Sequence, residues 1–174
     1  MISLNRKLHD KLASVNYIID GHNLIAHIPG LSLSMVDDEE RLIQLLIRYG
    51  KLHRGKLEVY FDGAPIGQVT KRNYGGVQAH FIIQSQTADD AIRSRLAKLG
   101  KSARNWKVVS SDRSIQAAGR EMHAGVVKSE DFANQLQEAL QTNPEVSGNE
   151  PNQALTPAEV EEWLAIFKQR KSIK

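Results

Sequence analysis

Acidic side chains stand at the ends of three apolar segments of this sequence. Asp20 and Asp62 each close a run of apolar and β-branched residues, and Asp112 follows a third run. A fourth acidic point, Asp89-Asp90, opens a helical segment. Crowded carboxylates repel one another unless they are protonated or share a cation, and hard cations such as Mg²⁺ or Mn²⁺ prefer oxygen ligands. We therefore expect a metal site here, with a metal-held water as a nucleophile for a phosphate.

Each acid also fits a structural role when it is taken alone. Asp62 precedes a glycine, and Asp-Gly is a common turn sequence. Asp89 and Asp90 would favour the start of a helix, and Asp89 lies four positions before Arg93, at the spacing of a surface ion pair. Asp112 would cap the helix that follows it. The coincidence of all the acidic points nevertheless favours a metal site over separate structural roles.

The elements that would position these acids alternate along the chain. We expect strands at 15–20, 56–63, 77–83, 106–110 and 125–128, and helices at 37–53, 87–99, 112 to about 122 and 129 to about 140. Thr87 and Ser129 are predicted N-caps, and Gly100 is a predicted helix stop. Residues 64–76 are rich in proline, glycine and basic side chains and predict a mobile basic loop.

Alternating strands and helices imply an α/β fold with a mostly parallel sheet and helices on both faces. In such sheets, ligands bind beyond the carboxyl ends of the strands. Asp20, Asp62 and Asp112 would meet at that edge. The sequence thus predicts both the fold class and the location of the site.

The chain of 174 residues is long enough for one domain, and it contains no cysteine. We expect an N-terminal extension at 1–14, a domain at 15–140, a linker at 141–155 and a C-terminal helix at 156–174. The last helix would start with a capping box and carry an apolar stripe. No segment has the length of a membrane span or the pattern of a signal peptide. The absence of cysteine fits a reducing compartment, so we expect the cytoplasm. No P-loop or Gly-x-Gly-x-x-Gly motif is present, so no nucleotide cofactor is expected.

Charge is distributed unevenly along the chain. Residues 66–107 carry 8 basic and 2 acidic side chains, whereas residues 129–162 carry 8 acidic and no basic side chains. The basic stretch predicts a polyanionic partner, with Tyr74 available to stack on a base. The basic residues expected to contact phosphates are Lys71, Arg72, Arg93, Arg95, Lys98, Lys101, Arg104 and Lys107.

Four motifs in order resemble the YacP-like branch of the NYN-domain ribonucleases, which belong with the PIN-like nucleases. The motifs are Ile18-Ile19-Asp20-Gly21-His22-Asn23-Leu24-Ile25, Val59-Tyr60-Phe61-Asp62, Thr87-Ala88-Asp89-Asp90 and Val108-Val109-Ser110-Ser111-Asp112. The resemblance covers 15–140 and leaves out 1–14 and the tail beyond about 141. It implies a three-layer α/β sandwich around a mostly parallel sheet, and metal-dependent endonucleolytic cleavage of RNA.

The resemblance also implies a role for each matching residue. Asp20, Asp89 and Asp112 would coordinate Mg²⁺ or Mn²⁺, and Asp62 and Asp90 would support them. Two further roles are implied around these acids: Asn23 would position Asp20 or the scissile phosphate, and Ser110 or Ser111 would hold a metal-bound water or an acid. From its position near Asp20 alone, His22 would pack the loop, touch the substrate or help a proton transfer.

Two other functions stay open at this point. One is a non-catalytic RNA-binding or ribosome-associated module, although a pure binder of polyanions gains nothing from a carboxylate cluster. The other is a PIN-like nuclease that acts on DNA, because no residue pattern reads the ribose 2′-hydroxyl.

Overall fold

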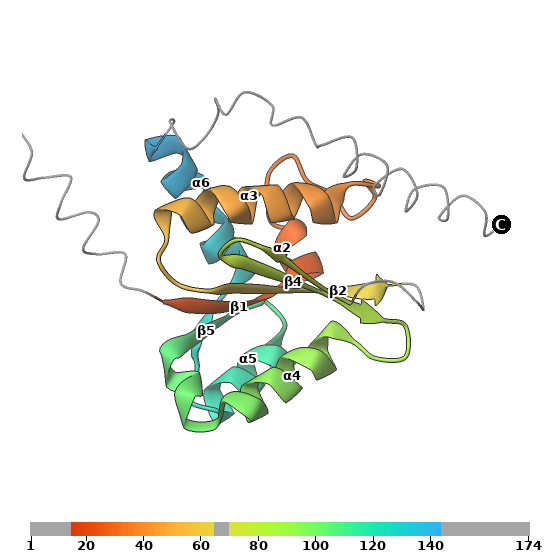
Figure 1. Cartoon of the computed structure of the whole chain (residues 1–174), viewed down its shortest axis with the longest axis vertical. Coiled ribbons are helices and arrows are strands. Elements are labelled where there is room, and N and C mark those ends of the chain that lie inside the picture. The colour runs from red at the N-terminus through yellow and green to blue at the C-terminus, as the bar shows by residue number, and fades with distance from the viewer. Residues whose placement is uncertain (1–14, 65–69, 144–174) are drawn as a thin grey trace, which may run out of the picture.

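The computed structural model describes residues 15–64 and 70–143 (Figure 1). Its strands are β1 (Asn16–Asp20), β2 (Leu57–Ala64), β3 (Lys71–Tyr74), β4 (Val77–Ile83), β5 (Trp106–Val109) and β6 (Gly125–Val127). Its helices are α2 (Gly21–Ile25), α3 (Asp38–Leu52), α4 (Ala88–Leu99), the 3₁₀ helix η1 (Gly100–Asn105), α5 (Arg113–Glu121) and α6 (Ser129–Thr142).

The described strands form one six-stranded sheet in the order β3-β4-β2-β1-β5-β6. All neighbouring strands are parallel except β3, which runs antiparallel to β4. The β1 register pairs Ile19 with Val59 of β2 and with Val109 of β5. This register brings the carboxyl ends of the three central strands to the same edge, as the sequence predicts.

Helices cover both faces of the sheet, so the fold is the expected three-layer α/β sandwich (Figure 1). On one face, α2, α3 and α6 enclose an apolar core in which Tyr49, Phe61 and Phe132 are fully buried. On the other face, α4 and α5 pack over a smaller core that includes Ile92 and Ile115. The central strands alternate between the two cores because successive side chains of a strand point to opposite faces.

The predicted loop at 64–76 is wrong for residues 71–74. These residues form the edge strand β3, which pairs with β4 from Lys71↔His80 to Tyr74↔Val77. The glycines that indicated a loop make the two-residue hairpin turn instead, with Gly75 at φ +63°. Two consecutive glycines between extended segments are typical of a tight hairpin. The short helices α2 and η1 were also not predicted, because neither is long enough to show helical periodicity.

Three predicted segments fall outside the described residues, wholly or in large part. These are the extension at 1–14, the linker at 141–155 and the helix at 156–174, of which only the first residues of the linker are described. The last described helix, α6, continues to Thr142. Among the residues that the structure describes, no helix combines the length and apolarity that crossing a membrane requires.

Gly55 offers a test of how tightly β1 and β2 approach each other. A Cβ at this position would overlap the backbone carbonyl of Val15 and touch the ring of His53. Gly55→Ala should therefore lower the free energy of unfolding by about 1–3 kcal/mol, the usual cost of overpacking. The matched control is Gly76→Ala, where a Cβ would meet nothing within 4 Å. Urea unfolding of both variants checks this, and equal stability of the two would contradict the close approach.

Candidate active site

Asp20 is the last residue of β1 and is almost enclosed, at 8% exposure. Its carboxylate accepts hydrogen bonds from the hydroxyl of Ser110 (3.0 Å) and the backbone N–H of Asn23 (3.3 Å). Both partners are neutral. Burial, followed by the charges of Asp89 and Asp62, raises the pKa of Asp20. The structure thus holds a carboxylate in a position where its charge is costly.

Asp62 and Asp89 meet at the start of α4. Asp62 lies at the end of β2, and its carboxylate accepts a hydrogen bond from the backbone N–H of Ala88. Thr87 is the N-cap, as predicted, and its hydroxyl accepts from the N–H of Asp90 (3.1 Å). These contacts fix the first turn of α4, from which Asp89 projects. Burial raises the pKa of Asp89, and the charges of Asp112, Asp62 and Asp90 raise it further.

Asp112 caps α5, which is the structural role that the sequence left open for it. Its Oδ1 accepts hydrogen bonds from the N–H groups of Ser114 (2.7 Å) and Ile115 (3.2 Å). These bonds, together with one from the Ser114 hydroxyl, hold the pKa of Asp112 below its usual range. Capping occupies one carboxylate oxygen, so the cap and a role in the acidic group are compatible.

Asn23 ties the ends of three elements together beside Asp20. Its side-chain oxygen accepts hydrogen bonds from the N–H of Ser111 (2.8 Å) and the hydroxyl of Ser129 (2.6 Å). Ser129 was predicted to cap α6, but the N-cap is Lys128. The Ser129 prediction is wrong because its hydroxyl turns inward to Asn23. Through these hydrogen bonds, Asn23 connects α2 to the end of β5 and to the start of α6.

Glu130 is a residue at this edge that the sequence did not single out. The hydroxyl of Ser111 donates to its carboxylate, and His27 Nε2 lies 3.9 Å from the same group. The available signal was positional, because Glu130 follows a strand and stands in the first turn of a helix, as Asp89 does. An acidic residue in the first turn of a helix is also common on protein surfaces, so this signal did not single it out.

We call the carboxyl edge with Asp20, Asp62, Asp89 and Asp112 the acidic edge. Ser110 bonds to both the Asp20 carboxylate and the N–H of Asp112, and the charges of Asp112 and Asp62 raise the pKa of Asp89, so the four acids share one edge of the sheet. Asp90 is exposed, and its charge raises the pKa of Asp89. Carboxylate oxygens with a neighbouring hydroxyl are a donor set that suits a hard divalent cation. However, within residues 15–64 and 70–143, no three acidic or histidine side chains are close enough to hold a metal ion as they stand.

The His22 side chain contacts α3. Its Nε2 lies 3.1 Å from the carboxylate of Glu39, and its ring meets Phe61 edge-on. The hydrogen bond that the imidazole makes to Glu39 raises the pKa of His22 despite partial burial. These contacts fit loop packing, one of the roles expected for His22.

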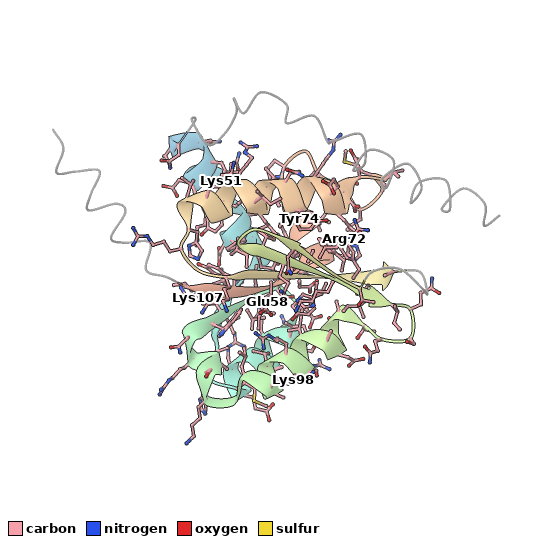
Figure 2. All side chains as sticks on the ribbon, viewed as in Figure 1. Lys51, Glu58, Arg72, Tyr74, Lys98 and Lys107 are labelled. Carbon is pink, nitrogen blue, oxygen red and sulfur yellow. The ribbon has the colours of Figure 1, made fainter. Side chains whose placement is uncertain are left out.

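The basic residues predicted to contact RNA lie on different sides of the molecule. Figure 2 shows Arg72 and Tyr74 on the α3 side of the sheet and Glu58 on the α4 side. Tyr74 packs against the larger core and its hydroxyl is buried, so its ring is not presented to a base. Arg95 makes two 2.8 Å hydrogen bonds to Glu58 and lies over the Trp106 ring. These contacts give Tyr74 and Arg95 structural roles.

Other predicted basic residues lie far from the acidic edge. Lys98 is in the last turn of α4, which at 12 residues is about 18 Å long, and Lys101 follows in η1. Arg104 and Lys107 line a hollow of about 450 Å³ at the amino-terminal edge of β1 and β5. Of the eight predicted basic residues, Arg93 and Lys71 remain as exposed cations on the α4 side nearer the acids. Arg93 donates to the Ser114 hydroxyl next to Asp112 (2.9 Å).

The sheet order and the acidic edge together define the class of this domain, a PIN-like α/β fold. A crystal structure of Rae1 (YacP) from Bacillus subtilis is similar, with a TM-score of 0.62 and 21% identity over 91% of this chain and 95% of that chain. A mutant of that protein gives the same TM-score and identity over 75% of this chain and 80% of that chain. No match was found among curated proteins.

The family model described as the YacP-like NYN domain matches residues 17–168. The chain belongs to this family, and the resemblance read from the four motifs is confirmed. The match continues past residue 140, where the motif resemblance ended, so the acidic tail falls largely within the family match. Membership supports a nuclease role.

The buried charge of Asp20 predicts an effect on stability. Asp20→Asn removes a carboxylate whose pKa is raised by burial, so in EDTA its melting temperature should be unchanged or higher by up to about 4 °C. The difference should narrow as the pH falls toward that raised pKa, because the wild-type carboxyl then takes up a proton. The control Glu138→Gln alters an exposed carboxylate of α6. A clear loss of stability for Asp20→Asn would contradict the conclusion that the buried charge of Asp20 destabilises the protein.

The Glu58–Arg95 pair gives a second prediction. Arg95→Ala should cost about 2–3 kcal/mol of unfolding free energy, less than a fully buried pair, because the arginine side chain is 31% exposed. The double variant Glu58→Gln with Arg95→Met should regain most of this loss, since it leaves no unpaired buried charge. Urea unfolding measures both. A double variant less stable than Arg95→Ala would show that the unpaired charge of Glu58 is not the source of the lost stability.

Proposed function

We propose that this protein is a metal-dependent endoribonuclease that hydrolyses phosphodiester bonds of RNA at the acidic edge. The observation that carries the proposal is the enclosed Asp20, which has neutral hydrogen-bond partners and a pKa raised by burial, Asp89 and Asp62. Such an arrangement costs stability unless a cation offsets it. Membership of the YacP-like NYN family supports the nuclease class, and RNA as substrate is our inference.

Asp20, Asp89 and Asp112 are the residues proposed to hold Mg²⁺ or Mn²⁺. When bound, such a cation supplies a more acidic water as nucleophile and positive charge beside the phosphoryl oxygens. The carboxylates come from three elements, β1, α4 and the cap of α5. They are separated in this structure, so binding would draw their side chains together.

The chain's other residues hold these acids in place. Ser110 donates one hydrogen bond to Asp20, and its own oxygen accepts from the N–H of Asp112 (3.1 Å). One hydroxyl group therefore connects two of the acids. Gln116 is buried and donates to the Ser110 carbonyl (2.9 Å). Asp62 anchors the first turn of α4, so it sets where Asp89 stands. Asp62 and Ser110 are thus positioning residues in this proposal.

Cleavage of labelled single-stranded RNA and DNA of one sequence tests the proposal. We expect RNA cleavage with Mn²⁺ or Mg²⁺ and none with EDTA. Asp20→Asn should reduce the rate by more than about 100-fold, because outer-shell partners alone account for 10–100-fold. Glu138→Gln should cleave like the wild type.

Mn²⁺ binding provides a readout that does not depend on turnover. A ligand that binds only the folded state raises its stability, so Mn²⁺ should raise the melting temperature of the wild type. This rise should be absent for Asp20→Asn. RNA binding without cleavage under all conditions would instead indicate a non-catalytic RNA-binding module, and faster cleavage of DNA would assign the substrate to DNA.

A further inference from the structure

The face of β3 and β4 on the α4 side is not covered by a described helix in the way that the rest of the sheet is. α4 packs over β1 and β2, where its buried residues join the smaller core. Beyond it, Lys71 and Asn73 of β3 are exposed, and Gln78 and His80 of β4 are partly exposed. We call these four residues the open face. The described part of the protein therefore presents a polar strand surface next to α4.

His80 is the flat element of the open face. Its ring stacks on the buried ring of Tyr60, with centroids 4.4 Å apart and planes 5° from parallel. The two residues are register partners on neighbouring strands about 4.8 Å apart, so the rings stand upright side by side. The second face of the His80 ring is then turned toward β3, where its register partner is Lys71. Burial lowers the pKa of His80, which favours the neutral form of the ring.

A row of amides holds this ring in place. The side chain of Gln78 donates to Asn73 (2.8 Å), and its oxygen lies 3.1 Å from His80 Nε2. The row is on the same face as His80 because Gln78 is two residues away along β4. A ring fixed in this way is pre-organised for stacking, which lowers the entropy cost of binding.

The open face continues into the acidic edge. Asp62 follows Tyr60 by two residues on β2, a separation of about 7 Å. Its carboxylate reaches Ala88 at the start of α4, so it points to the same side of the sheet as Tyr60 and His80. One strand of nucleic acid at the acidic edge would therefore pass onto the open face within about one nucleotide.

The charge of this region suits a polyanion. Lys71 is exposed on β3 beside His80, whereas Arg93 of α4 is turned toward Ser114 of α5. We propose that the open face binds the RNA strand beside the scissile phosphodiester, with one base stacked on His80 and a phosphate against Lys71. This inference rests on the proposed function, and it names the path by which the substrate leaves the acidic edge.

Binding of a short fluorescein-labelled single-stranded RNA in EDTA, followed by anisotropy, tests the open face. We expect His80→Ala to weaken binding about tenfold, the usual size of one base–aromatic stacking contact. His80→Phe should bind like the wild type, because it keeps a flat ring. Lys71→Ala should weaken binding and reduce its salt dependence. The matched control Lys56→Ala removes an exposed lysine just before β2, at the opposite edge of the sheet.

Abasic substitutions in the RNA separate stacking from general weakening. One abasic position should weaken binding to the wild type about tenfold and leave binding to His80→Ala unchanged. If the wild type cleaves RNA while His80→Ala and Lys71→Ala bind it as tightly as the wild type does, the open face is not the RNA path. The proposed function survives that result, whereas a wild type that neither binds nor cleaves RNA overturns both.

Discussion

The repulsion among carboxylates at one edge of a parallel sheet is the constraint around which this protein is organised. Parallel pairing of β1 with β2 and β5 brings the ends of these strands together, so their terminal acids meet. Asp20 is the focus, because it is both enclosed and close to other negative charges. The neighbouring Ser110 and Asn23 supply hydrogen bonds that reduce the cost of its charge without removing it. The cation proposed for this edge would offset that cost.

The position of α4 links this edge to the rest of the fold. At its first turn, the backbone N–H of Ala88 donates a hydrogen bond to Asp62. Further along the helix, Arg95 donates two hydrogen bonds to the buried carboxylate of Glu58. Both anchors lie on β2, so one strand fixes the helix in two places. Asp89 lies between Ala88 and Arg95 along α4, so its position depends on both of these contacts. Arg95 therefore belongs to the support of the site, even though it lies in the basic stretch.

The two faces of the sheet serve different purposes. The α3 side is an apolar core that encloses Tyr49, Phe61 and Phe132 and supplies most of the hydrophobic burial. The α4 side carries the polar line from Glu58 through Tyr60 to His80 and is only partly covered. This asymmetry leaves one side closed by an apolar core and the other with polar groups at its surface. It also explains why basic residues of one stretch have different roles, since strand alternation sends Arg72 and Lys71 to opposite faces.

The sequence by itself determined the alternation of strands and helices, the sheet edge that carries Asp20, Asp62 and Asp112, and the family, because these follow from local patterns and ordered motifs. It predicted the caps at Thr87 and Asp112 for the same reason. Only the tertiary structure decided that Arg95 is paired with Glu58, that Tyr74 is packed inward and that Ser129 bonds to Asn23. The tertiary structure also decided that residues 71–74, within the predicted loop at 64–76, form β3, since an edge strand forms only beside a partner strand such as β4. These outcomes depend on partners distant in sequence, and the direction in which a side chain points is set by those partners.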